Sequence, residues 1–377
     1  MSDAREYFVV CTLGLEAVVA HELEELGAQD LRVGRGGISC VGGRRLGYAM
    51  NLWLRAAIRV QDLVLRGSAG SPPELYRCVR EVDWSELLSP AHTLAIDASV
   101  MSSWMTHGNY AAQVVKDAIV DQLRERHGVR PDVDRELPDV PLKLVLREND
   151  VILYRNLSGA SLHKRGWRRV QVKSPLNEAT AAGLLLASEW DRTSSLVDPM
   201  CGSGTFLIEA AHIAMGRPPG LTRRFPFERW PDFDATAWSE LRAEARRRMR
   251  SEPGVELVGF DRHPGAIAIA KASAEAAGVG AFVRFEQRAA VDAHLPRPPG
   301  MVVVNPPYGE RLGEDETQLY DSWRQLARFL HEECSGSVAW VLSGNADLTR
   351  LLRLRTSRKL PVRNGPLDCR WLRYEIR

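Results

Sequence analysis

The chain has 377 residues, 45% of them hydrophobic, which is enough for two or three domains of roughly 150 residues with cores of their own. Its formal net charge is +2, so attraction of a charged partner must come from local clusters. Six cysteines without a C-x-x-C pair argue against a zinc site or a disulfide framework and favour a reducing compartment. The first residues show no signal-peptide pattern, and no apolar run approaches the ~18 residues of a membrane span. We therefore expect a cytoplasmic protein with neither a membrane partner nor a metal.

Residues 1–66 alternate between strand-like and helix-like segments and predict a small α+β domain. Apolar residues at every third or fourth position mark its helices, and Gly27 ends the first of them. The run Gly-Ser-Ala-Gly-Ser-Pro-Pro at 67–73 predicts a linker. The expected strands are 6–11, 36–41 and 58–65, and the expected helices are 15–26 and 46–57.

Residues 67–160 predict a second α+β domain. Its longest helix has a continuous apolar side and ends at Gly128, and a turn at 147–150 joins its last two strands. Because this region carries no catalytic spacing, we interpret residues 1–160 as a binding or positioning module. The expected helices are 75–88 and 110–126, and the expected strands are 93–100, 142–146 and 151–156.

A basic segment at 161–173 separates this module from the rest of the chain. Its five Lys or Arg residues, one Trp and one His suit phosphate contact and base stacking, although a solvated linker would have a similar composition. A helix follows over 179–187, and we include Asn177, just before it, among the candidate cofactor contacts. The candidate RNA contacts of this segment are Lys164, Arg165, Trp167 and Arg168.

A glycine-rich turn between a strand (194–197) and a helix (207–215) predicts a cofactor loop of the Rossmann kind. Leu207 occupies the place of the third Gly or Ala of a dinucleotide fingerprint, and the Gly-Lys-Ser/Thr of a phosphate-binding P-loop is missing. The acid at the strand end, Asp198, would repel a pyrophosphate and attract the amino or sulfonium group of S-adenosylmethionine. The candidate cofactor contacts here are Asp198, Cys201, Gly202, Gly204 and Thr205.

Two further acids follow the next two strands. Asp261 comes after a strand over 255–260, where its carboxylate can accept both hydroxyls of a ribose. A helix over 265–277 and a strand over 283–286 then lead to Asp292, which either contacts the adenine amino group or is a plain loop residue. We treat both acids as candidate cofactor contacts.

The strand over 301–304 is wholly apolar and stops at Asn305-Pro306-Pro307-Tyr308. This loop is stiff, because proline fixes its own φ and extends the residue before it. The Asn305 side-chain oxygen and the Pro306 carbonyl can accept the two hydrogens of an exocyclic amino group, and Tyr308 can stack on the ring that carries it. Taken alone, the four residues are also typical of an ordinary strand-ending turn. We treat all four as catalytic candidates, and Asn305 as a cofactor contact as well.

An insertion at 216–252 places arginines among Phe225, Phe227 and Trp230. This pattern suits either RNA contact or a lid whose aromatic residues are ordinary core. We take Arg223 and Arg224 as candidate RNA contacts. The remaining expected elements are helices over 235–250 and 320–332, a strand over 337–343, and a hairpin of 358–362 with 369–376 around Asn364-Gly365.

Residues 198–211, which begin Asp-Pro-Met-Cys-Gly-Ser-Gly, and the Asn-Pro-Pro-Tyr-Gly-Glu-Arg-Leu-Gly of 305–313 resemble motifs of the THUMP-domain RNA guanine-N2 methyltransferases. Residues 161–168, 223–230 and 364–370 are most similar to the bacterial large-subunit rRNA members. The resemblance implies an α/β fold, with a Rossmann-like class I methyltransferase domain at 161–377. A ferredoxin-like domain at 1–66 and an RNA-binding THUMP domain at 67–160 would precede it.

The same resemblance implies S-adenosylmethionine as the cofactor and RNA as the partner, with methyl transfer to the exocyclic N2 of a guanine. The familiar rRNA enzymes carry a second methyltransferase domain. Because this sequence ends at Arg377, we expect no second activity of that kind, which leaves tRNA open as a substrate besides 23S rRNA.

Three other functions share parts of this pattern. DNA and protein-glutamine methyltransferases also use Asn-Pro-Pro-Tyr, but the N-terminal module and the basic junction argue against them. Adenine-N6 methylation would use the same loop, and only analysis of the product separates it from guanine methylation. An RNA-binding protein with an inactive methyltransferase fold is disfavoured, because the acids, glycines and Asn305 expected of an active site are all present.

Overall fold

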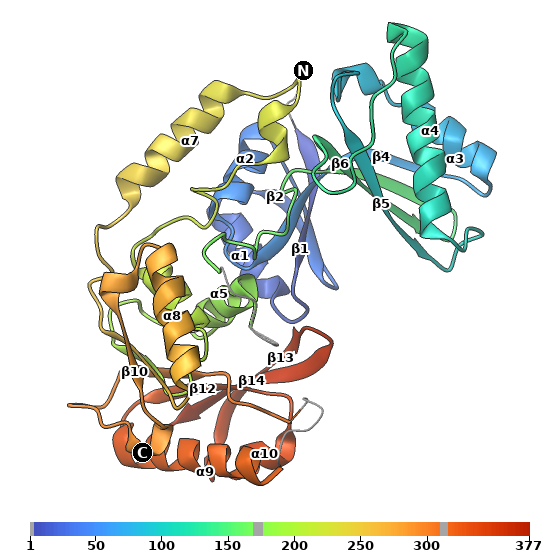
Figure 1. Cartoon of the computed structure of the whole chain (residues 1–377). Coiled ribbons are helices and arrows are strands. Elements are labelled where there is room, and N and C mark those ends of the chain that lie inside the picture. Colours follow the sequence, from blue (N-terminus) through green and yellow to red (C-terminus); the bar gives the residue numbers. More distant parts are fainter. Residues whose placement is uncertain (1–3, 169–175, 310–315) are drawn as a thin grey trace.

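The computed structural model describes residues 4–168, 176–309 and 316–377. It contains two seven-stranded sheets, one in each half of the chain (Figure 1). Within the described ranges, no helix combines the length and the apolar character that crossing a membrane requires.

The first sheet joins both predicted N-terminal domains, in the strand order β2-β3-β1-β4-β7-β6-β5. Its central strand β4 is twelve residues long and pairs with β1 along its first half and with β7 along most of its length. The elements of this half are β1 (Arg5–Cys11), α1 (Glu16–Glu25), β2 (Gln29–Gly34), β3 (Gly37–Gly42), α2 (Arg44–Trp53), β4 (Ala57–Ser68), α3 (Pro72–Arg80), η1 (Trp84–Glu86), β5 (Leu94–Met101), α4 (Gly108–His127), β6 (Val140–Arg147) and β7 (Asp150–Asn156).

The linker predicted at 67–73 is wrong for most of its length. Gly67 and Ser68 belong to β4, and Pro72 opens α3, so only 69–71 connect two elements. A Cβ on Gly67 would lie 2.5 Å from the Cys78 Sγ of α3. The glycine therefore allows a helix to pack closely on a strand rather than marking a flexible segment.

Two other expectations also need correction. The strand β2 was not predicted. It lies at the sheet edge with five of its six residues exposed, so its sequence lacks the alternation of apolar and polar residues that marks a strand. The helix expected over 75–88 ends at Arg80, and the short turn η1 buries Trp84 instead.

The second sheet has the order β10-β9-β8-β11-β12-β14-β13. The five strands from β10 to β12 are parallel, and β14 is antiparallel to both of its neighbours. Its elements are α5 (Glu178–Ala187), β8 (Leu196–Asp198), α6 (Thr205–Ala214), η2 (Pro226–Arg229), α7 (Ala235–Arg248), β9 (Leu257–Asp261), α8 (Pro264–Ala276), η3 (Gly280–Phe282), β10 (Val283–Gln287), η4 (Ala290–Asp292), β11 (Met301–Val304), α9 (Glu316–Glu333), β12 (Val338–Ser343), α10 (Ala346–Arg350), β13 (Thr356–Asn364) and β14 (Leu367–Glu375).

Helices cover both faces of this sheet. Helices α5, α6 and α8 share one apolar core with one face of the strands, whereas α9 and α10 share another core with the opposite face. Because both faces are buried, strand β11 is apolar at every position, as the sequence predicts.

The insertion at 216–252 packs on the N-terminal half, where α7 lies beside α2 (Figure 1). Phe225, Phe227 and Trp230 are buried in the N-terminal core, and Phe227 stacks on Tyr48 with ring centroids 4.6 Å apart. The sequence left open whether these aromatic residues contact RNA or belong to an ordinary core. The structure favours the core, because all three are buried.

A buried charge cluster ties the same insertion to the N-terminal sheet. The Arg155 guanidinium is 1% exposed and donates to Asp62 at 2.9 Å and to Asp232 of the insertion at 3.0 Å. It also lies 4.3 Å from the centroid of the Trp230 ring. The insertion therefore fastens the two halves of the chain together.

We expect the Arg155→Ala variant to lose about 3 kcal/mol of unfolding free energy, because the buried Asp62 would keep only the partly exposed Arg5 as an ion-pair partner. Urea unfolding followed by circular dichroism measures this loss. The matched control is Arg45→Ala, whose pair with Glu240 is exposed and should contribute less than about 1 kcal/mol. Equal effects of the two substitutions would contradict the account of this interface.

Candidate functional site

Three predicted side chains follow the carboxyl ends of adjacent parallel strands. Asp198 ends β8, Asp261 ends β9, and Asn305 follows β11 on the other side of β8. The strand order reverses between β8 and β11, and open α/β sheets bind ligands at such a switch point. The structure thus brings together residues that are more than one hundred positions apart in the sequence.

The glycine-rich turn connects β8 to α6 above this edge. The Cys201 amide donates to the Phe260 carbonyl at 2.8 Å, and the Gly202 amide donates to Asp261 Oδ2 at 2.9 Å. Gly202 has a φ of +55°, and a Cβ built on it would meet nothing within 4 Å, so the space over it is open. Gly204 instead allows the Phe285 ring to pack closely on the turn, because a Cβ on Gly204 would lie 2.7 Å from that ring. The turn is therefore fixed on β9 while one of its glycines faces free space.

Two carboxylates close to this turn favour a cationic ligand. Asp198 is 2% exposed, and burial raises the pKa of its carboxyl well above the usual range. The Met200 amide partly offsets this shift in pKa, and the nearby negative charge of Asp261 adds to it. A positive group bound beside the two acids would offset the free-energy cost of keeping a buried carboxylate charged. The two carboxylates therefore fit the amino or sulfonium group of S-adenosylmethionine.

The Asn305 side chain carries an acceptor that the described residues do not use. Its Oδ1 atom is buried, and no described donor lies within hydrogen-bonding distance. Leaving a buried acceptor unsatisfied costs about 1–3 kcal/mol, so its persistence at a ligand edge needs an explanation. Other buried polar atoms without a partner occur in the described chain, but most are arginine or tryptophan nitrogens, which are donors.

The rest of the Asn-Pro-Pro-Tyr loop is held from two sides. The buried Trp323 of α9 donates its Nε1 hydrogen to the Pro307 carbonyl at 2.6 Å. Asn364, at the end of β13, donates to the Tyr308 hydroxyl at 2.7 Å. Sequence analysis placed Asn364 in a hairpin turn and in one of the stretches that carry the resemblance, so its contact with the loop was missed. No local pattern reveals it, because the two residues are 56 positions apart.

The other cofactor candidates lie around this edge in different ways. Asn177 caps α5, where its Oδ1 accepts from the Thr180 amide at 2.7 Å. The Thr205 hydroxyl accepts from Arg168 at 2.9 Å at the start of α6. Cys201 is buried, and burial holds the pKa of its thiol well above the usual range, so it stays a neutral thiol. Asp292 is exposed at the end of η4, and its expected adenine contact remains a prediction.

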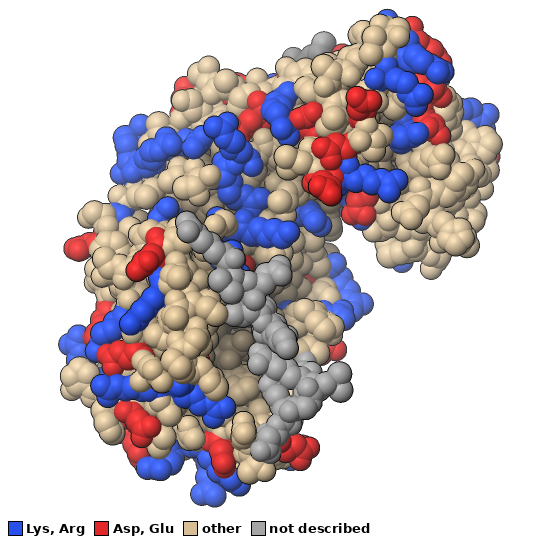
Figure 2. Space-filling view, in the orientation of Figure 1, with Lys and Arg blue, Asp and Glu red and all other residues tan. Residues whose placement is uncertain are grey.

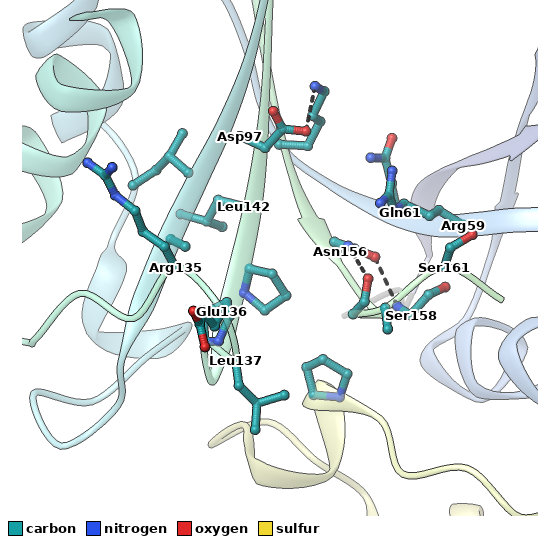
Figure 3. A pocket seen from close by; sticks show the side chains of 18 of the residues that line it. Arg59, Gln61, Asp97, Arg135, Glu136, Leu137, Leu142, Asn156, Ser158 and Ser161 are labelled. Atoms are coloured by element: carbon teal, nitrogen blue, oxygen red, sulfur yellow. Dashed lines mark hydrogen bonds and ion pairs between the residues drawn. The ribbon is translucent and has the colours of Figure 1, made fainter. Parts of the chain in front are cut away.

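The edge of the second sheet that carries Asp198, Asp261 and Asn305 is called the cofactor edge. A second region, separate from this edge, is a cleft with a volume of about 1570 Å³. It lies between strands β4 to β7, helix α4, the junction after β7 and the insertion, as Figure 3 shows. Figure 2 shows Lys and Arg gathered on the same upper part of the molecule, notably over α7. The basic side chains among its lining are Arg59, Lys116, Arg135, Lys143, Lys164, Arg223, Arg224 and Arg229.

The sequence predicted only part of this lining. Lys164 and Arg224 are exposed and line the cleft, as an RNA contact must. Arg223 also lines it, but its guanidinium donates to the carbonyls of Ser161 and Lys164, so it holds the junction in place. Lys143 and Arg59 were missed, because single basic residues on alternating strands give no local cluster.

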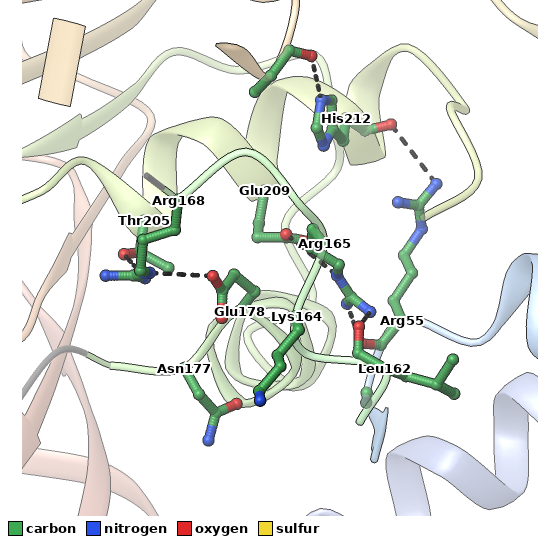
Figure 4. A network of polar contacts seen from close by, with 12 residues as sticks. Arg55, Leu162, Lys164, Arg165, Arg168, Asn177, Glu178, Thr205, Glu209 and His212 are labelled. Carbon is green, nitrogen blue, oxygen red and sulfur yellow. Dashed lines mark hydrogen bonds and ion pairs between the residues drawn. The ribbon is translucent and has the colours of Figure 1, made fainter. Parts of the chain in front are cut away.

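Three other candidate RNA contacts point inward, which corrects the expectation for them. Trp167 is 3% exposed and packs in the core of the C-terminal half, so its ring is not available to stack on a base. Arg165 is buried against Glu209 of α6, as Figure 4 shows. Arg168 pairs with Glu178 of α5 at 3.0 Å. The charges of the two arginines are used inside the protein, because each arginine pairs with a buried acid on a neighbouring helix.

Comparison with known families agrees with this architecture. Residues 165–373 match the family described as RMKL-like, methyltransferase domain. Residues 6–61 match the RlmL ferredoxin-like domain, and residues 70–156 match the THUMP domain. The chain therefore belongs to the RMKL-like methyltransferase family. More particularly, it carries the family's methyltransferase domain behind an RlmL-type ferredoxin-like domain and a THUMP domain, which confirms the predicted fold.

Two similar proteins have names that agree with this family. A candidate RNA methyltransferase of Synechocystis, slr0064, is 37% identical over 376 residues, which are 100% of this chain and 98% of that protein. The ribosomal RNA large subunit methyltransferase K/L of Syntrophotalea carbinolica is 40% identical over 386 residues. That alignment covers 98% of this chain but 53% of the relative, so the chain spans about half the length of this protein.

A solved structure has the same fold over the whole chain. SMU.472, a candidate methyltransferase crystallised with SAH, has a TM-score of 0.92, is 27% identical, and is matched over 99% of its length and 100% of this chain. SAH is S-adenosylhomocysteine, the form of the cofactor after methyl transfer. The expectation of S-adenosylmethionine as the cofactor is thus confirmed at the level of the family.

We expect Asp261→Asn to weaken binding of S-adenosylhomocysteine about tenfold, because the amide has one acceptor fewer and no charge. Isothermal titration calorimetry measures the change. The control is Asp191→Asn, which alters a carboxylate that caps the Thr193 and Ser194 amides just before β8, away from the cofactor edge. A change of similar size in the control, or none in Asp261→Asn, would remove Asp261 from the cofactor site.

Proposed function

We propose that the protein transfers a methyl group from S-adenosylmethionine to the exocyclic N2 of a guanosine in RNA, with large-subunit (23S) rRNA as the first candidate substrate. The observation that carries this proposal is the buried, unused Asn305 Oδ1 at the switch point beside two acids. An acceptor in that position suits an amino group that enters the site from the substrate.

Methylation of this amino group requires hydrogen-bond acceptors rather than a strong base. The lone pair of a guanine amino group is delocalised into the ring, so the nitrogen is a weak nucleophile. The Asn305 oxygen and the Pro306 carbonyl would orient the –NH2 group and stabilise the positive charge that develops on nitrogen. Tyr308, whose hydroxyl is fixed by Asn364, would stack on the base. The target base must leave its stack to reach this loop.

The remaining task of the chain is to hold the cofactor in line with this nitrogen. When bound, S-adenosylmethionine would supply an activated methyl group for the new N–C bond, with S-adenosylhomocysteine as the leaving group. Asp198, Asp261 and the turn around Gly202 are the residues that would hold it. The amino group loses one proton to solvent once it carries the methyl group.

The case for RNA as the substrate rests on the N-terminal half together with the junction and the insertion that line the cleft beside it. Its THUMP domain and the basic lining of the cleft, with exposed Lys164 and Arg224, suit a phosphate backbone. The name of the Syntrophotalea relative supports rRNA. A tRNA would present the same chemistry to the site, and the loop could also accept the amino group of an adenine.

We expect labelled S-adenosylmethionine and unmodified 23S rRNA to give N2-methylguanosine in nucleoside analysis. The Asn305→Ala variant should lose about 100-fold in rate, the scale seen when an electrostatic stabiliser of a transition state is removed. The matched control is Asn149→Ala, which alters an exposed asparagine in the β6–β7 turn and should leave the rate unchanged.

The alternatives predict different products. N2-methylguanosine in tRNA alone would move the substrate but keep the mechanism. N6-methyladenosine would overturn the guanine assignment. Methylation of DNA or protein, or no product in any nucleic acid, would overturn the proposal that RNA is the substrate.

A further inference from the structure

Arg168 connects three segments at the cofactor edge. Its Nε atom donates to Glu178 at 3.0 Å, and one Nη2 hydrogen bond goes to the Leu176 carbonyl at 3.1 Å. The same guanidinium donates to the Ser203 hydroxyl at 3.2 Å and to the Thr205 hydroxyl at 2.9 Å. Figure 4 shows Arg168 reaching from the junction to Thr205, with Glu178 beside it.

The two hydroxyls belong to the cofactor turn itself. Ser203 lies between Gly202 and Gly204, both of which have positive φ, and Thr205 begins α6. A turn that contains two glycines has few side chains of its own to fix it. The neighbouring Ser203 and Thr205 hydroxyls lie 3.3 Å apart, and one guanidinium holds both. Arg168 therefore supplies an external support for the turn.

The chemistry of this contact requires a guanidinium. Arginine presents its donors as a rigid, planar fork, so a single side chain can hold an acid, a carbonyl and two hydroxyls together. A lysine would keep the charge but would place its donors at a single nitrogen. The Arg168 side chain is 12% exposed and its partner Glu178 is 5% exposed, so water screens the pair little.

We propose that Arg168 is a positioning residue that fixes the glycine-rich turn in the form that binds S-adenosylmethionine. It acts through Ser203 and Thr205. This role concerns the cofactor alone, so it holds whichever base or nucleic acid the protein methylates. It replaces the RNA contact that the sequence pattern suggests for this residue.

The test is calorimetric titration of the full chain with S-adenosylhomocysteine. We expect Arg168→Lys to bind it on the order of tenfold more weakly, because charge-assisted hydrogen bonds to the turn are lost. In steady-state assays, the KM for S-adenosylmethionine should rise by the same factor, with a smaller change in kcat. The control is Arg324→Ala, which removes an exposed arginine paired with Asp321 on α9.

A double-mutant cycle with Ser203→Ala separates positioning from general stability. If Arg168 acts through Ser203, the loss of affinity in the double variant should be smaller than the product of the two single losses. A lowered melting temperature with unchanged affinity for S-adenosylhomocysteine would overturn the proposal. Loss of RNA affinity alone would also overturn it, and would restore Arg168 as an RNA contact. Failure to find N2-methylguanosine would leave this result unaffected.

Discussion

The parallel pairing of β11 with β8 is the constraint on which the site depends. The chain runs outward from β8 to β10 and then returns to the opposite side of β8, so that the ends of β8, β9 and β11 share one edge. That pairing places Asn305 beside the two acids, and it requires the apolar run of β11 to be buried on both faces. A polar residue within 301–304 would disturb both the core and the position of the Asn-Pro-Pro-Tyr loop.

Several arginines with little solvent exposure pair with acids on other segments of the chain. Arg155 holds the insertion on the N-terminal sheet, Arg165 pairs with α6, and Arg168 holds the cofactor turn. Each is compensated by an acid on another segment, which is the condition for burying a charge. Within the described part of the basic segment, Lys164 is exposed and lines the cleft. Arg165 connects α6 to the Arg55 carbonyl of the N-terminal half, and Arg168 connects α5 to the glycine-rich turn.

The sequence predicts well that three polar side chains meet at one edge of the second sheet, because the signal for each is local. Asp198, Asp261 and Asn305 each follow an apolar strand, and strand ends in a parallel sheet meet at one edge. The basic and aromatic segments were harder to interpret. Composition alone cannot distinguish an arginine that meets phosphate from one that meets a buried glutamate, since Glu178 and Glu209 approach Arg168 and Arg165 only in the fold. For the same reason, the contact of Asn364 with the loop and the place of Arg59 and Lys143 in the cleft were missed.

The central claim is that Asn305 recognises the amino group of the target base. Its most direct test uses an RNA that the protein methylates and the same RNA with inosine, which lacks that amino group, at the target position. Affinities are measured in the presence of S-adenosylhomocysteine. We predict that inosine weakens binding to the unaltered protein about tenfold and leaves binding to Asn305→Ala unchanged. The same loss in both proteins would contradict the claim.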